Sequence, residues 1–212
     1  INIFKFLNNL DFGIYSLFYG KIIEAKNMPW YYSILWIVIT TPLFYIILSL
    51  YGIFNFFIKL LLETKKNFNT QNFYLDSIFV LILTIPIVGS IIFKSSSYNG
   101  WRHLYFIYPY LIIFSLLGYK KIIEKISNSK IFTLVFNVST ISIILFYLFW
   151  MAYNHPHQYA YFNILAGKDI HKKFDIDYWG LSYKENLNYI SQNDSREKIY
   201  IKNNSENNLF YF

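Results

Sequence analysis

Arg102 and His103 are the adjacent side chains best suited to chemistry in this sequence, and they stand at the edge of an apolar run. They belong to the stretch Tyr98-Asn-Gly-Trp-Arg-His-Leu-Tyr-Phe-Ile-Tyr-Pro109. A permanently charged guanidinium beside a membrane segment is costly unless it meets a partner, and its planar fork matches a phosphate. Gly100 would let the backbone approach such a ligand closely. The alternative is that Arg102 only reaches lipid headgroups, as arginines at the ends of membrane helices do.

Two further pairs of polar residues lie later in the chain. His155 and His157 flank a proline without a third ligand at a useful spacing, so interfacial hydrogen bonding is favoured over a metal site. Asp175 and Asp177 are spaced like strand residues on one face, and paired carboxylates can do acid–base work or hold a cation. Capping of the helix that follows is the favoured role for this pair. The residues therefore indicate no metal ligand set.

The composition indicates a membrane protein. Of the 212 residues, 55% are hydrophobic and only 15% are charged, against roughly 25% charged in an ordinary soluble domain. The mean hydropathy of +0.31 predicts several membrane spans plus a polar remainder. The sequence contains no cysteine, which excludes disulfides and thiolate metal sites within it. The net charge of +7 comes mostly from lysines at the ends of apolar runs, so no nucleic-acid partner is expected.

Four apolar runs are long enough to cross a bilayer as helices, which takes about 20 residues. The sequence thus predicts an all-α polytopic membrane protein with spans near residues 31–58, 77–93, 104–119 and 131–153. The first run exceeds one straight span, so we expect a helix that is tilted or kinked at Pro42, plus an interfacial stretch. The expected division is a loop segment over residues 1–30, a membrane domain over 31–153 and a tail over 154–212.

The placement of lysines predicts the orientation of these spans. Seven lysines lie in the connections after the first and third spans, whereas the loop before the third span holds only Lys94 and Arg102. Positively charged loops stay cytoplasmic, so the Arg102 loop, residues 1–30 and the tail are expected on the extracytoplasmic face of the inner (cytoplasmic) membrane. Lys5, Lys21 and Lys26 count against this orientation, so the bias is modest.

The tail is expected to form a small α/β unit. The stretch Ser182-Tyr-Lys-Glu185 matches a capping box, and Leu187 and Ile190 continue an apolar helix face after it. Residues 198–202 alternate like a strand, and residues 209–212 could form another. A tail of this size cannot bury its own aromatic residues, so we expect it to pack against the loop that precedes Arg102.

Four stretches in order resemble one enzyme superfamily. The first resembles the arginine–aromatic–proline signature before a late span of the protein O-mannosyltransferase and aminoarabinose transferase superfamily, and the others are similar to bacterial members of glycosyltransferase family thirty-nine. The stretches are residues 100–109, residues 28–32 running into 40–42, residues 155–163 and residues 175–180. The resemblance implies a GT-C fold, that is, a multi-pass enzyme that moves a sugar from polyprenyl phosphate to an acceptor on the extracytoplasmic face.

The resemblance also implies roles for single residues. Arg102 and His103 would bind the phosphate of the donor. Candidates for contacts with the sugar or the acceptor are Trp101, His155, Asp177, Tyr178 and Trp179. The rings of Tyr178 and Trp179 could stack on a sugar, and packing on the tail's own core is the equal alternative for them. The family keeps its catalytic carboxylate in a first extracytoplasmic loop that nothing here matches, so we expect the C-terminal half of such an enzyme, without its general base.

The partners implied are a polyprenyl-phosphate-linked sugar, membrane lipid and an acceptor that is a glycan, a lipid or a protein. No cofactor is strictly implied, and a divalent metal is compatible with the chemistry. The rival interpretation is a non-catalytic polytopic membrane protein, such as a transporter of lipid-linked sugars or an assembly subunit. This rival explains the spans and Arg102 as a headgroup contact, but not the Asp-Tyr-Trp-Gly stretch at residues 177–180.

The orientation can be tested by labelling. Cysteines introduced at Ser96 and Asn203 should react with an impermeant thiol reagent on intact cells, whereas a cysteine at Asn128 should not, because the lysines around it hold that connection in the cytoplasm. The chain has no cysteine of its own, so the background is low. Labelling at Asn128 alone would reverse the predicted orientation.

Overall fold

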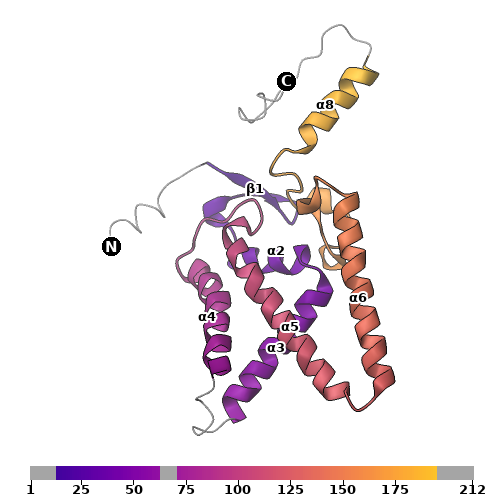
Figure 1. Ribbon diagram of the computed structural model, residues 1–212. Helices are drawn as coiled ribbons and strands as arrows, with labels where there is room; N and C mark the ends of the chain where they lie inside the picture. The colour runs from indigo at the N-terminus through magenta and orange to yellow at the C-terminus, as the bar shows by residue number, and fades with distance from the viewer. Residues whose placement is uncertain (1–12, 63–70, 195–212) are drawn as a thin grey trace.

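The computed structural model describes residues 13–62 and 71–194, which form a helical bundle with a small cap at one end (Figure 1). The cap contains a two-stranded antiparallel hairpin, the loop before Arg102 and residues 154–181 of the tail. The principal elements are β1 (Tyr15–Phe18), β2 (Lys21–Glu24), α2 (Tyr32–Thr40), α3 (Leu43–Leu62), α4 (Gln71–Ile92), the 3-10 helix η2 (Arg102–Ile107), α5 (Tyr108–Ile126), α6 (Lys130–Tyr153), α7 (Ile170–Lys173) and α8 (Ser182–Asn193).

The prediction of four spanning helices is confirmed at the level of helix length and composition. The helices that could cross a membrane are Leu43–Leu62, Tyr74–Ile92, Arg102–Ile126 and Lys130–Tyr153. The fourth matches its predicted bounds closely, and the second begins three residues before the predicted start. The third continues to Ile126, well beyond the predicted end at residue 119. The prediction ended the span where the apolar run ends, but the helix itself continues through the lysines that follow.

The predicted first span, residues 31–58, is wrong in its extent. The chain breaks between Thr40 and Leu43, so α2 is a separate nine-residue helix and only α3 is long enough to span. Pro42 is the physical cause, because the residue before a proline is pushed out of the helical region. Thr41 accordingly has an extended backbone, with φ −102° and ψ 139°.

Helices α3 and α5 cross at close range through two glycines (Figure 1). A Cβ atom built on Gly52 would lie 2.2 Å from the carbonyl oxygen of Phe114, and one on Gly118 would lie 2.0 Å from the carbonyl oxygen of Leu48. Only glycine lets two backbones approach so closely, as at other crossings of membrane helices. A third contact supports the crossing, because Ser115 Oγ donates to the Tyr45 carbonyl across the interface at 2.7 Å.

Helix α6 packs loosely by comparison. A tight turn joins it to α5, and the two helices separate toward the cap (Figure 1). Only 6% of its spanning window is buried. Its contact with α5 near the turn is made by Tyr119, which stacks on Phe136 at 5.6 Å and donates its hydroxyl proton to Asn137 at 2.7 Å. An apolar helix with so little buried surface is expected to face lipid.

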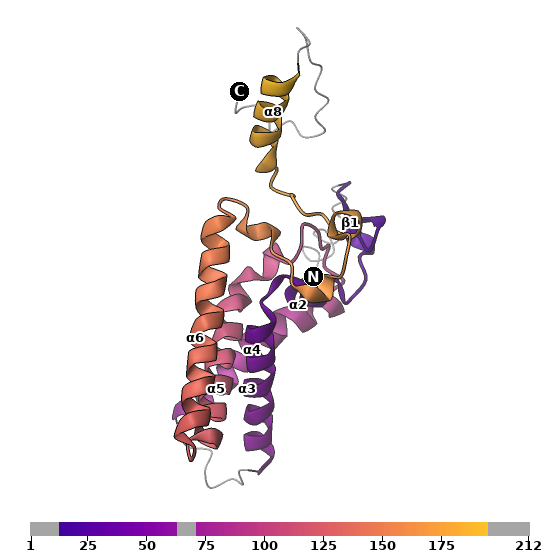
Figure 2. The same cartoon turned by 90° about the vertical axis from the view of Figure 1, so that its right-hand side faces the viewer.

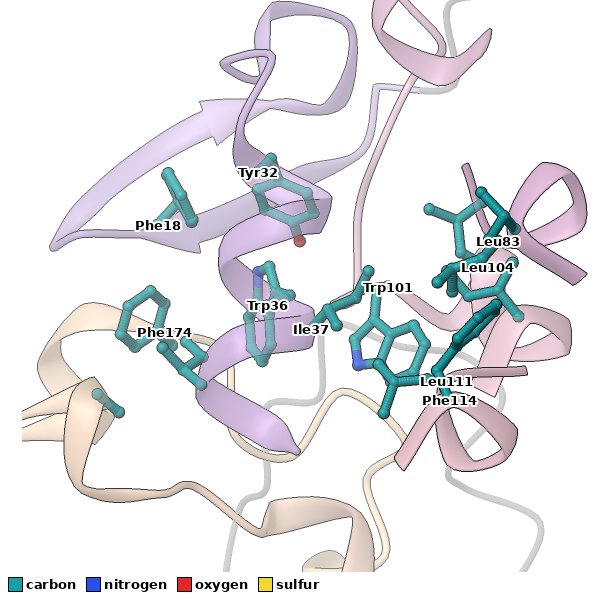
Figure 3. Close-up of a cluster of buried hydrophobic side chains, with 14 of the residues drawn as sticks. Phe18, Tyr32, Trp36, Ile37, Leu83, Trp101, Leu104, Leu111, Phe114 and Phe174 are labelled. Carbon is teal, nitrogen blue, oxygen red and sulfur yellow. The ribbon is translucent and has the colours of Figure 1, made fainter. Parts of the chain in front are cut away.

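An aromatic cluster holds the cap together. Phe18 of the hairpin lies 4.9 Å from Tyr32 of α2 and 5.9 Å from Phe174 after α7, and Trp36 lies 5.5 Å from Phe174 (distances between ring centroids; Figure 3). Phe18 and Phe174 also form an isolated β-bridge. Three segments that are far apart in the sequence therefore share one buried core.

The hairpin was not expected, since residues 1–30 were predicted to be a loop segment. Its turn is Tyr19-Gly20, and both residues have positive φ, 50° and 76°. This is the backbone of a two-residue turn whose twist suits a hairpin. Tyrosine is uncommon at such a position, so the turn could not be recognised from the residue types.

Two short 3-10 helices, α7 and α8 alternate with loops in the described tail, and the bridge at Phe174 is the one β contact within residues 154–194. The helix predicted after residue 182 is confirmed as α8, which extends away from the bundle in both views (Figure 2). The strands predicted at residues 198–202 and 209–212 lie outside the described residues, so the α/β character of the tail remains a prediction.

The glycine crossing generates a stability prediction. Gly118→Ala should lower the free energy of unfolding by about 1–3 kcal/mol, because the methyl group cannot fit beside a backbone carbonyl unless the helices move apart. Gly89→Ala is the matched control, since nothing lies within 4 Å of a Cβ at this helical position. Thermal unfolding of the purified chain in detergent should show a lower midpoint for the first variant only. Equal midpoints for both variants would contradict the close crossing.

Candidate functional site

A left-handed turn places Arg102 at the start of η2. Asn99 and Gly100 both have positive φ, 54° and 71°. The turn is fixed from the neighbouring helix α2, because the N–H of Gly100 donates to the hydroxyl of Tyr32 at 3.1 Å and the glycine lies against the ring of Trp36. A side chain at Gly100 would meet both the strained backbone and the indole.

Trp101 is a packing residue and not an open surface for a sugar. It is 6% exposed, and its indole N–H donates to Thr40 Oγ1 at 2.9 Å. Its ring contacts Tyr105 at 4.7 Å and Tyr108 at 5.9 Å between centroids. Burial and the bonded N–H give Trp101 a packing role in the core, and its contact with a sugar or an acceptor stays a prediction.

The guanidinium of Arg102 lies between two aromatic rings. Its central carbon is 4.5 Å from the ring centroid of Tyr98 and 5.5 Å from that of Trp179. Its Nε–H donates weakly to Nε2 of His103 at 3.4 Å, and His103 packs edge-on against Tyr98 at 5.0 Å. Within residues 13–62 and 71–194, no carboxylate pairs with Arg102. Cation–π contacts hold the group without neutralising its charge.

The tail reaches this loop, as predicted. Trp179 contacts Arg102, and the hydroxyls of Tyr178 and Tyr105 are 3.0 Å apart. Trp179 remains 52% exposed, so one part of its surface is open beside the guanidinium. The structure thus brings Arg102, His103, Tyr178 and Trp179 together from two distant segments.

Asp177 caps α8 and does not face this cluster as a free carboxylate. It accepts hydrogen bonds from the hydroxyls of Tyr159 and Ser182 and, at 3.1 Å each, from the N–H groups of Leu181 and Ser182. Burial disfavours its charged form, but these hydrogen bonds outweigh burial and hold the pKa of Asp177 below its usual value. Asp177 is therefore a structural anion at a helix start.

The capping box predicted at Ser182 is wrong in its details. Ser182 is already inside α8, and no side-chain hydrogen bond comes from the N-cap residue Leu181. The orphan N–H groups are satisfied by Asp177 from outside the helix. Glu185 does not fold back onto the cap, since its carboxylate lies 3.2 Å from Nε2 of His157. A capping box needs both side chains to point at the helix start, and tertiary partners prevent this.

The remaining predicted residues do not converge. His155 Nδ1 lies 2.9 Å from the side-chain amide of Gln158, so His155 and His157 have separate partners. Asp175 accepts the N–H of Leu17 at 2.9 Å, and burial raises its pKa above the usual value despite hydrogen bonds from Leu17 and Ser16. Across the described part of the chain, no three histidine or acidic residues come together as a metal site would require.

An apolar groove of about 500 Å³ lies between α3, α5 and α6. Sequence reasoning missed it, because it results from the separation of α6 from its neighbours. Its walls include Pro42, Ile112, Leu116, Ile144, Leu148 and Met151, and its hydroxyl groups come from Thr40, Tyr45, Tyr108, Tyr147 and Tyr161. Trp101 connects the groove to Arg102, since it contacts Thr40 and Tyr108 on the groove wall and precedes the arginine.

No protein-family model matches this chain, and neither the curated proteins nor the solved structures contain a significant match to it.

The cap formed by Asp177 can be tested by substitution. Asp177→Asn replaces one acceptor oxygen by an NH₂ group that faces hydrogen-bond donors, so the start of α8 should be destabilised by about 0.5–2 kcal/mol. Hydrogen exchange of the α8 amides should become faster by a corresponding factor. Asp169→Asn is the control, because Asp169 is exposed and only approaches Lys172 at 3.6 Å.

The same cap should depend on pH. The pKa of Asp177 is lower in the folded chain than in the unfolded one, so its contribution is present above about pH 4 and is lost as the pH falls through the folded pKa. Amide protection of α8 should fall in acid for the wild type and should be insensitive to this step in Asp177→Asn. Identical pH profiles for the two proteins would contradict the cap.

Proposed function

We propose that this chain is the C-terminal part of a membrane glycosyltransferase that uses a polyprenyl-phosphate-linked sugar as its donor. One observation carries the proposal. The charged Arg102 lies at the end of a candidate span, unpaired with any carboxylate of the described chain, one residue from the tryptophan that borders an apolar groove. An amphipathic lipid phosphate is the ligand that would use both features.

The phosphate end of the donor would bind at Arg102. Tyr98 and Trp179 flank the guanidinium, so less side-chain freedom is lost when the arginine engages a ligand. A charge-assisted bond from arginine to phosphate is among the stronger hydrogen bonds in proteins. His103 adds a second nitrogen next to the guanidinium, and its position beside Tyr98 keeps it at the same edge of the loop.

The hydrocarbon end of the donor would occupy the groove between α3, α5 and α6. Its lining is mainly apolar, with tyrosine hydroxyls, and α6 is expected to face lipid because only 6% of its spanning window is buried. A chain in the bilayer can enter such a groove from the side. Trp101 would then lie between the phosphate end and the hydrocarbon end of the ligand. Its buried ring is held by the hydrogen bond to Thr40, so it would keep the two binding regions in a fixed position relative to each other.

In the transfer, Arg102 would stabilise the negative charge that develops on the departing lipid phosphate. Such preorganised charge in a water-poor site can lower a barrier by several kcal/mol. Activation of the acceptor would need a carboxylate, and neither aspartate of the tail suits this role. Asp175 is held by Leu17 and Ser16, and Asp177 caps α8. We infer that the base comes from another part of the enzyme, as the resemblance implies.

The proposed location is the extracytoplasmic face of the cytoplasmic membrane. The hairpin, the Arg102 loop and the described tail gather at one end of the bundle, and the end of α3 and the turn between α5 and α6 lie at the other (Figure 1). In the sequence, seven lysines lie within residues 59–76 and 119–130. The positive end would stay in the cytoplasm. A lipid-linked donor would therefore be used after it has reached the outer leaflet.

The proposal can be tested by donor binding. Arg102→Ala should weaken the binding of undecaprenyl phosphate to the full chain in nanodiscs by about tenfold to a hundredfold, because a charge-assisted contact worth about 1.5–3 kcal/mol is lost. Arg102→Lys should give an intermediate loss, since it keeps the charge but not the fork. Native mass spectrometry can measure both.

Lys121→Ala is the matched control, because Lys121 carries the same charge at the other end of α5 and pairs with Glu124 at 2.6 Å. Its affinity for undecaprenyl phosphate should stay at the wild-type value. In the complete enzyme, sugar transfer should fall with Arg102→Ala while expression and membrane insertion stay normal. Unchanged binding in Arg102→Ala would assign the arginine to ordinary headgroup contact and remove the donor site.

A further inference from the structure

A second cavity is lined in part by the loop that carries Arg102. It consists of two adjoining parts of about 200 and 350 Å³, which share the serines Ser33, Ser90, Ser95 and Ser97 as walls. The larger part is of the size that takes small-molecule ligands. Its walls come from the segment between β2 and α2, the start of α2, the end of α4 and the loop after α4.

Serine hydroxyls line both parts of this cavity, and the loop that carries Ser95 and Ser97 is held by backbone hydrogen bonds. Ser97 donates its N–H to the carbonyl of Ala25 at 3.1 Å, and Ser95 donates its N–H to the carbonyl of Ser90 at 3.0 Å. Ser90 Oγ donates to Ile87 at 2.7 Å and Ser97 Oγ donates to Ser95 at 3.2 Å, which leaves the lone pairs of both hydroxyls for a ligand. A hydroxyl accepts two hydrogen bonds while it donates one. Such a wall suits a polyhydroxylated ligand.

Two lysines give the cavity its charge. Lys94 follows the end of α4, and Lys26 reaches the cavity from the hairpin side, where it pairs with Glu24 at 2.7 Å. No carboxylate pairs with Lys94 among the residues that the structure describes. The end of a helix carries partial negative charge, so Lys94 is what makes this region favourable for an anion.

An aromatic wall completes the cavity. Trp30 lines the larger part and is 67% exposed, although it is followed by a buried helix. Its ring contacts Tyr31 only edge-on, at 5.6 Å, which leaves an indole face open. Exposed tryptophan beside hydroxyls and cations provides both an apolar face and polar contacts for a ring-shaped polar ligand.

We infer that this serine- and lysine-lined cavity binds an anionic carbohydrate, that is, a sugar that carries a phosphate or a carboxylate. The serines would bond the sugar hydroxyls, Lys94 and Lys26 would meet the negative charge, and Trp30 would cover a face of the ring. The inference goes beyond the donor site, because Arg102 and the apolar groove contribute nothing to this cavity. Trp101 and His103, which line its smaller part, lie between the two sites.

Binding of small sugars to the full chain in phosphatidylcholine nanodiscs tests this site. The probes are glucose 6-phosphate, glucuronate, glucose and inorganic phosphate, measured by calorimetry. The two anionic sugars should bind at least about tenfold more tightly than glucose or inorganic phosphate. Glucose lacks the negative charge that the lysines would bind, and phosphate lacks the sugar hydroxyls that the serines would bind. If glucose bound as tightly as glucose 6-phosphate, the lysines would have no role in binding. If inorganic phosphate bound as tightly as glucose 6-phosphate, the cavity would be a simple anion site.

Variants then assign the cavity. Lys94→Gln should weaken the binding of glucose 6-phosphate about tenfold. Lys26→Gln should also weaken this binding, although Glu24 already pairs with the charge of Lys26. Lys121→Gln and Arg102→Ala should leave the sugar affinity unchanged, and Lys94→Gln should leave undecaprenyl phosphate binding unchanged. The two sites can therefore fail separately.

Three results would overturn the inference. One is an unchanged affinity for glucose 6-phosphate in both Lys94→Gln and Lys26→Gln. Another is a loss of sugar binding in Arg102→Ala equal to that in Lys94→Gln, which would place the sugar at the donor site. The third is displacement of the sugar when phosphatidylglycerol is added to the nanodiscs, which would make the cavity a phospholipid headgroup site.

Discussion

The backbone contact between α3 and α5 at Gly52 and Gly118 is the constraint on which the rest of the molecule depends. It sets where α5 lies, and α5 continues directly from η2, which begins with Arg102. In a lipid environment there is little hydrophobic gain in bringing two helices together, so the close fit of backbones must supply the attraction. The position of the charged site is thus decided about halfway down the bundle, far from the charge itself.

The cap supplies hydrogen-bond partners for backbone N–H and carbonyl groups where helices end. The side chain of Asn163 donates to the carbonyls of Val38 and Thr41 at 2.6 and 2.7 Å, where Pro42 has ended α2. Asn163 belongs to the tail that follows α6, so these hydrogen bonds hold the tail against the break in the chain at Pro42. In the loop before Arg102, the hydroxyl of Tyr32 instead accepts a hydrogen bond from the N–H of Gly100.

Sequence patterns predicted what depends on hydrophobicity and failed where tertiary partners decide. Four long apolar runs and the helix after residue 182 were predictable, because composition and periodicity are local. The meeting of Trp179 with the Arg102 loop followed from the need of a small tail to cover its aromatic residues. The cap by Asp177 was predictable too, since capping was the favoured role for Asp175 and Asp177, and it is confirmed for Asp177. The contact of Asp175 with Leu17 and the groove beside α6 could not be read from the sequence, since each depends on how separate segments are placed.

Helix α6 contains 24 residues and α3 contains 20. At 1.5 Å per residue their lengths are about 36 and 30 Å, while a bilayer core is about 30 Å thick. The longer helix can match the bilayer by tilting, and its residues line one side of the groove. A change in bilayer thickness that alters this tilt is therefore expected to alter the width of the groove as well.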